Sequence, residues 1–146
     1  DCLLSRGLGD VYKRQFFSYS ARGPGERDDG TIAPTAAASS IAFAPEIVVP
    51  CVKAMKRTYG AGIYTEWGFL DSFNPTLTVR DGALQHGKIV DGVGWVDGDY
   101  LGIDQGPIVI MTENHRSEFV WRYMRGEPNI RRALDIAGFT GGWMNG

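Results

Sequence analysis

Asp104 has the clearest chemical potential in this sequence, because it stands where a long helix is expected to begin. The apolar spacing predicts that helix from Ile103 or Asp104 to about Met124. Free backbone amides and the helix dipole favour the ionised form of a carboxyl group in a first helical turn. An ionised Asp there suits a general base or a nucleophile and is badly placed to donate a proton. The alternative is a structural role as the helix cap.

A second acidic group lies in a glycine-rich loop, where Asp28 and Asp29 follow Arg22. Carboxylates accept paired hydrogen bonds from adjacent sugar hydroxyls, and neighbouring aromatic rings can cover the apolar face of a sugar. These residues are therefore candidates for binding a neutral carbohydrate. The alternative is a solvated loop in which the Asp side chains form Asx turns.

Two further candidates lie on the long helix and in the glycine-rich segment before it. Glu113 and Arg116 are spaced i,i+3, which predicts a surface ion pair unless they contact substrate. Glu113 lies nine residues beyond Asp104, on a different face of the helix. Trp95 stands among glycines, where it serves either as a sugar platform or as a packing anchor.

Two familiar binding motifs fail for mechanical reasons. Residues 82–89 match a phosphate loop, except that Ile89 stands where Ser or Thr would bind magnesium. Residues 97–108 begin like a calcium loop, but Leu101 and Ile108 offer no side-chain oxygen at their positions. No metal and no cofactor is therefore predicted.

Prolines and glycines delimit most of the elements that must position these residues. Pro34 begins a short helix over residues 34–38, and Pro45 begins a longer one that Gly60 ends. Gly126 ends the long helix that contains Asp104, and residues 128–138 form a last helix.

The segment between these helices, residues 61–103, is rich in glycine. A short helical turn is expected within residues 64–73, a strand over 76–79, and a long shaped loop over 82–102. Because helices dominate and strands do not alternate with them, the predicted fold is mostly α, without a parallel α/β sheet.

Composition excludes several classes of protein. The chain has 146 residues, 43% of them hydrophobic and 22% charged, which is typical of a globular protein. Its net charge of −2 lacks the basic footprint of a nucleic-acid binder. The longest apolar run is far shorter than the roughly 18 residues that a membrane-spanning helix needs.

Several blocks in a fixed order make the chain similar to the bacterial glucoamylase-like family, which includes endo-β-1,2-glucanases and a domain of cyclic β-1,2-glucan synthases. The resemblance runs from Ser20 onward, with His115 where the family tends to have Tyr. The blocks are Ala21-Arg22-Gly23, residues 28–37 beginning Asp28-Asp29-Gly30-Thr31, residues 67–74 beginning Trp67-Gly68-Phe69, Trp95-Val96-Asp97, residues 100–108 beginning Tyr100-Leu101-Gly102-Ile103-Asp104-Gln105, and Glu113-Asn114-His115-Arg116.

The resemblance implies an (α/α)6 toroid whose central cleft cuts glucan chains with inversion. Inversion needs one carboxyl group as acid and another as base. Asp104 matches a position that looks catalytic in the family, whereas the family's acid corresponds to no residue of this sequence. The implied substrate contacts are Arg22, Asp28, Asp29, Trp95, Tyr100, Gln105, Glu113 and Arg116.

We expect the chain to consist of two parts of different origin. Residues 1–15 are expected to be a foreign head left by an adapter or by sequence assembly, and residues 16–146 the C-terminal portion of a glucoamylase-like (α/α)6 domain. Twelve helices with their loops need about 190 residues. We therefore expect a fragment that lines half of the cleft, is inactive and unstable alone, and leaves apolar faces open.

The expected function is that of a glycoside hydrolase acting on β-glucan, with β-1,2-glucan favoured. Its expected partners are an oligo- or polysaccharide and the N-terminal half of its own domain. A periplasmic or secreted location is implied by the resemblance alone. The alternatives are a non-catalytic carbohydrate-binding or scaffold domain, and a transglycosylase domain of a cyclic glucan synthase.

Overall fold

Five α-helices and five short strands make up the part of the chain that the computed structural model describes, which is residues 29–78, 84 and 86–145. The helices are α1 (Pro34–Ser39), α2 (Pro45–Tyr59), α3 (Gly102–Ser117), α4 (Phe119–Gly126) and α5 (Pro128–Ile136). The strands are β1 (Tyr64–Thr65), β2 (Gly68–Phe69), β3 (Ser72–Asn74), β4 (Lys88–Val90) and β5 (Gly94–Asp97). Short 3₁₀ turns are η1 (Gly60–Gly62) and η2 (Gly142–Asn145).

The helices begin and end close to where the sequence predicts. Proline occupies the first turn of α1, α2 and α5, where its missing N–H costs no hydrogen bond. Gly60 follows α2 with a positive φ of 50°, as expected of a glycine that ends a helix.

The long helix predicted to reach Met124 is in fact two helices. Glu118 separates α3 from α4 and takes the left-handed conformation, with φ 53° and ψ 24°. The Asn114 side chain bridges this break, because its Oδ1 accepts a hydrogen bond from the backbone N of Trp121 at 3.1 Å. A break without glycine or proline leaves no local signal in the sequence.

The segment between α2 and α3 is organised by strands, which the sequence analysis missed. β1 and β2 form a hairpin, and β3, β5 and β4 form an antiparallel sheet in that order. The helical turn expected within residues 64–73 is therefore wrong, and the expected loop over 82–102 contains β4 and β5. Residues 76–78 are not a strand, and Val79 lies outside the described residues.

Glycine allows two strands of this sheet to approach closely. Gly94, at the start of β5, has a φ of 105°, and a Cβ atom built there would lie 2.3 Å from the backbone O of Asn74. Any side chain at this position would push β5 away from the end of β3.

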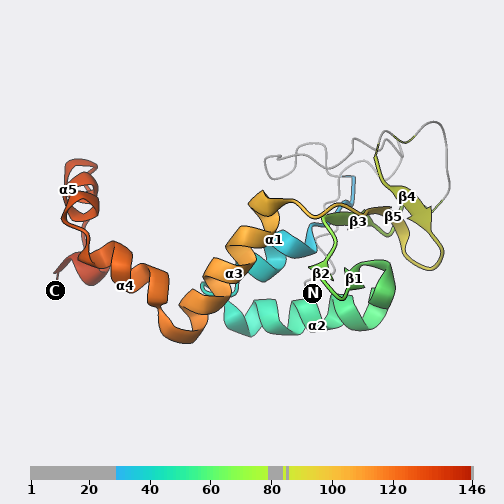
Figure 1. The fold of residues 1–146 in the computed structure, drawn as a ribbon, viewed down its shortest axis with the longest axis horizontal. Coiled ribbons are helices and arrows are strands. Elements are labelled where there is room, and N and C mark those ends of the chain that lie inside the picture. The colour runs from blue at the N-terminus through green and yellow to red at the C-terminus, as the bar shows by residue number, and fades with distance from the viewer. Residues whose placement is uncertain (1–28, 79–83, 85, 146) are drawn as a thin grey trace.

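The core lies where α2 meets the strands. Its buried members include Met55 from α2, Ile63, and Phe73 and Val96 from the paired strands β3 and β5. α1 packs against both α2 and α3, so the start of α3 is held beside the sheet, whereas α4 and α5 extend away from this body (Figure 1).

Mainly helical structure is confirmed, with about 55% of the described residues in helices. In this same part of the chain, no helix is both long and apolar enough to cross a membrane.

Candidate active site

Asp104 lies in the first turn of α3, as the sequence predicts. Leu101 is the N-cap, and the backbone N of Asp104 donates a hydrogen bond to Leu101 O at 3.0 Å. The alternative in which Asp104 caps the helix is therefore wrong, because it lies three residues inside. Its side chain is half-buried.

Asp71 lies beside Asp104 and is the main site residue that sequence analysis missed. It directly precedes β3, where Ser72 pairs with Asp97 of β5. The backbone N of Asp71 donates to Asp99 O at 3.2 Å, and its O accepts from Thr35 Oγ1 at 3.5 Å. These contacts fix the Asp71 backbone between α1 and the segment that leads into α3.

Gln105 ties the first turn of α3 to the same place. Its Nε2 donates to the backbone O of Phe69 at 3.1 Å. The amide that was expected to bind substrate therefore holds α3 against the residues just before Asp71.

Three carboxyl groups, Asp71, Asp97 and Asp104, interact here, and we call them the acidic cluster. The Asp71 side chain is only 3% exposed. Burial raises the pKa of Asp71 above its ordinary value of 3.8, and a hydrogen bond with Asp104 and the charges of Asp104 and Asp97 raise it further. The Ser72 hydroxyl, which donates to Asp71 Oδ2 at 2.9 Å, acts in the opposite direction on this pKa.

Exposed aromatic side chains flank the chain that enters α3. Tyr100 is partly exposed, and its hydroxyl contacts Thr65 Oγ1 at the end of β1. Trp67 stands 75% exposed at the β1–β2 turn, where its backbone N donates to Thr65 Oγ1 at 3.1 Å. If the β1–β2 hairpin had been predicted, Trp67 would have been a candidate for sugar binding. A large aromatic side chain in a hairpin turn has little core to pack against and is therefore exposed.

Trp95 does not have the role expected of a sugar platform. The side chain is 0% exposed, and its Nε1 donates to His86 O at 2.9 Å. Its position in β5, between Asn74 of β3 and Ile89 of β4, buries the ring. A ring without exposed surface offers no face to a sugar, so the alternative of a packing anchor is correct.

Asp29 forms the Asx turn that was the alternative to sugar binding. Its Oδ1 accepts from Thr31 N at 3.0 Å, and its backbone O accepts from Asn74 Nδ2 at 2.8 Å. The candidates Arg22 and Asp28 lie outside the described residues.

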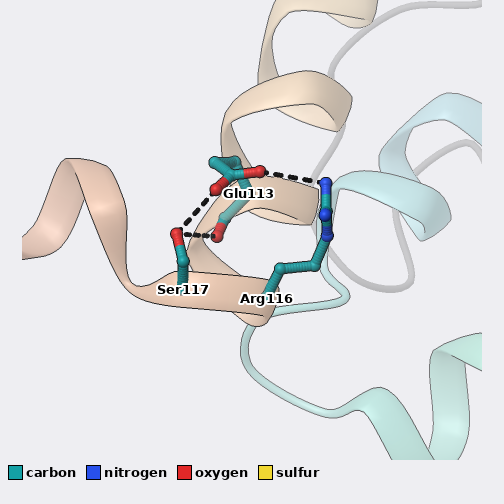
Figure 2. Close-up of polar contacts among 3 residues, drawn as sticks. All are labelled: Glu113, Arg116 and Ser117. Atoms are coloured by element: carbon teal, nitrogen blue, oxygen red, sulfur yellow. Dashed lines mark hydrogen bonds and ion pairs between the residues drawn. The ribbon is translucent and has the colours of Figure 1, made fainter.

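Glu113 and Arg116 form the predicted ion pair farther along α3 (Figure 2). Arg116 Nη1 lies 3.3 Å from Glu113 Oε2, and Ser117 Oγ donates to Glu113 Oε1 at 2.6 Å. Nine residues at about 1.5 Å each separate Glu113 from Asp104 by about 13 Å along the helix axis. The ion pair is therefore not part of the acidic cluster.

The described residues contain no group of three or more His, Cys, Asp or Glu side chains placed to hold a metal ion.

Comparison with known proteins gives consistent matches. The Glycoamylase family model, described as "Putative glucoamylase", matches residues 5–128. This match begins inside the segment expected to be foreign, which lies outside the described residues.

Individual relatives point in the same direction. The chain is 29% identical over 119 residues to an exo β-1,2-glucooligosaccharide sophorohydrolase of Parabacteroides distasonis, covering 81% of this chain and 14% of the relative. An endo-β-1,2-glucanase from Chitinophaga pinensis, solved with sophorotriose and glucose, matches with a TM-score of 0.61 and 33% identity over 80% of this chain and 24% of that one.

A third match is the solved structure of a "putative glucoamylase" from Bacteroides uniformis. It has a TM-score of 0.67 and 36% identity, covering 87% of this chain and 27% of that one. The chain thus spans between 14% and 27% of the length of these relatives. The expectation of a mostly α chain that corresponds to part of a glucoamylase-like toroid is confirmed. With the family model covering most of its length, the chain belongs to the glucoamylase-like (Glycoamylase) family.

Proposed function

We propose that this chain is part of a glycoside hydrolase that cleaves β-glucan, most specifically β-1,2-glucan, with inversion at the anomeric carbon. The observation that carries the proposal is the position of Asp104, a half-buried carboxyl group in the first turn of α3 beside two other carboxyl groups. The relatives named as β-1,2-glucan hydrolases support the choice of substrate.

Asp104 acts as the general base. Its carboxylate takes a proton from a water molecule, which attacks the anomeric carbon on the face opposite the leaving oxygen. A second carboxyl group protonates that oxygen, and inverting enzymes place the two groups about 6.5–9.5 Å apart. We assign this acid role to none of the described residues; Asp71, whose pKa burial raises, is only 3% exposed.

Exposed aromatic rings supply the apolar part of sugar binding. Trp67 and Tyr100 offer uncovered ring surface next to the segment that carries Asp104. Pyranose rings stack on such faces while their hydroxyls bind carboxylates and amides. Trp67 thus takes the role that Trp95 does not have.

The test uses the longest reading frame that encodes this chain, with purified β-1,2-glucan as substrate. Asp104→Asn is expected to lower kcat by about 10²–10⁴-fold, the usual contribution of a positioned general base, while oligosaccharide binding persists. Asp135→Asn, the same change at an exposed site on α5, is the matched control and should hydrolyse normally.

The configuration of the first product tests the stereochemistry. Proton NMR during the first turnovers should detect the α-anomer of the released sugar; the β-anomer would exclude inversion. Unchanged hydrolysis by Asp104→Asn would remove Asp104 from the mechanism. Binding without hydrolysis by the wild type would favour a carbohydrate-binding or scaffold domain, and longer oligosaccharide products would favour a transglycosylase.

A further inference from the structure

Asp71 is only 3% exposed, too deep to touch a substrate, and its side chain interacts with the candidate base Asp104. Its backbone is fixed at both polar atoms, by Asp99 O and by Thr35 Oγ1. Two further links, the Ser72–Asp97 strand pairing and the Gln105–Phe69 hydrogen bond, bring the start of α3 to the same position. The proximity of Asp71 to Asp104 therefore follows from the arrangement of β3, β5 and α3.

The polar surroundings of Asp71 are incomplete for an ionised carboxylate. Oδ2 accepts one hydrogen bond from Ser72, whereas no N–H or hydroxyl donor reaches the fully buried Oδ1 among the described residues. A buried carboxylate oxygen without a donor is costly, and a proton on the carboxyl group removes most of that cost.

The charged groups around Asp71 also favour the protonated form. Asp97 faces it from β5 and Asp104 from α3, and both are acidic. Asp97 is itself engaged, because its Oδ1 accepts from Asp99 N at 3.2 Å. From α1, the neutral Thr35 hydroxyl contacts the backbone O of Asp71. Two carboxyl groups share a hydrogen bond only when one of them carries a proton.

We propose that Asp71 is a positioning residue that stays protonated and donates a hydrogen bond to the Asp104 carboxylate, fixing the orientation of the general base. This inference rests on the proposed function of Asp104. Asp71 touches no substrate in this arrangement, so its effect is on kcat rather than on KM. When Asp71 loses its proton, Asp104 loses a hydrogen-bond donor and gains a negative neighbour.

Matched substitutions in the longest reading frame separate this role from simple packing. Asp71→Asn keeps a donor without a charge and should retain kcat within about 3-fold, while losing the alkaline fall in activity caused by ionisation of Asp71. Asp71→Val, which fills a similar volume without a donor, should lower kcat about 10–100-fold with an unchanged KM, within the range for a lost charge-assisted hydrogen bond. A Val variant as active as wild type, or an Asn variant as impaired as Val, would overturn the proposal.

A stability measurement tests the carboxyl pair without relying on hydrolysis. Because the pKa of Asp71 is raised in the folded state, the native protein binds more protons than the unfolded chain just above pH 3.8. Wild-type Tm should therefore fall relative to that of Asp71→Asn as pH rises from 3.8 towards the raised pKa. In the Asp104→Asn variant, the fall of Tm with pH should be smaller but still present, because burial still raises the pKa of Asp71.

The two proposals fail in different ways. A Tm difference between Asp71→Asn and wild type that is independent of pH would refute a protonated Asp71, whatever the activity. Unchanged hydrolysis by Asp104→Asn, together with the expected pH dependence of Tm, would instead refute the role of Asp104 as base and leave the carboxyl pair standing.

Discussion

The strand-bearing body and the terminal helices use their large apolar side chains in opposite ways. In the body, which comprises α1, α2 and β1–β5, Phe73, Trp95 and Met55 are fully buried. In the terminal helices, α4 and α5, no residue is buried, and Tyr123 and Ile136 are 71% and 77% exposed. Both regions contain helices with apolar faces, but only the body buries large side chains from such a face, as α2 buries Met55.

The difference shows what local sequence patterns can and cannot determine. Local signals predict helical structure over α5 and, as the end of one longer helix, over most of α4, but burial needs a partner surface. Within the described residues, α4 contacts α3 and α5, and its Trp121 ring lies against Phe43; an open hollow of about 210 Å³ is lined by Trp121, Met124, Arg125, Ile130 and Trp143. Large apolar side chains are exposed on α4 and α5, and others are exposed on α3, among them Ile103 and Val109.

The largest expected effect is the loss of a body side chain. Phe73→Ala removes a buried ring that lies 4.8 Å from the Tyr59 ring, between ring centroids, and should cost about 3–5 kcal/mol of unfolding free energy. Ile136→Ala, at an exposed position of α5, should change it by no more than about 0.5 kcal/mol. Urea unfolding of each variant measures both changes. Equal shifts in the two midpoints would contradict the contrast between the regions.

The junction between the regions should show an intermediate effect. Asn114 is buried, and its side chain supplies the acceptor for Trp121 N. Asn114→Ala should cost about 1–3 kcal/mol, the penalty for leaving a buried group unpaired. It should also speed amide exchange in α4 more than in α2.

Hydrogen exchange followed by mass spectrometry measures that asymmetry. Asn129→Ala serves as the control, because Asn129 is exposed and its side chain, within the described part of the chain, hydrogen-bonds only to Glu127. If exchange rose equally in α2 and α4, Asn114 would stabilise the whole fold rather than the junction.

The smallest effect should come from the left-handed residue at the same break. Glu118→Gly and Glu118→Ala both remove the exposed pairing of Glu118 Oε2 with Arg125, which is 2.9 Å long. Gly adopts a φ of 53° without steric cost, so the Gly variant should be more stable than the Ala variant by about 1 kcal/mol. Thermal unfolding of the two variants measures this gap; its absence would mean that the break relaxes when Glu118 is replaced.

Elements with local signals were predictable, and those that depend on distant partners were not. Pro34, Pro45 and Pro128 fix helix starts through their own geometry, so α1, α2 and α5 emerge almost as expected. The strands have between two and four residues, too few to show alternation, and β3 pairs with a segment more than twenty residues away.

The candidate site divides in the same way. Asp104 could be identified because the effect of a helix start on a carboxyl group depends only on neighbouring residues. The pairing of Glu113 with Arg116 was also correctly expected, from their spacing. Asp71 was missed, and Trp95 misjudged, because the surroundings of both depend on the pairing of β3 with β5. Substrate contact by Tyr100, Gln105, Asp29, Glu113 and Arg116 remains a prediction.

The close strand contact at Gly94 limits which substitutions this sequence can accept. Its backbone lies so close to Asn74 O that no other residue fits without moving a strand. Gly98, Gly102 and Gly106 have open space where a side chain would begin. A chain so rich in glycine therefore does not tolerate change uniformly. In a library that substitutes every glycine, variants at position 94 should be depleted, while Gly98 should accept most residues.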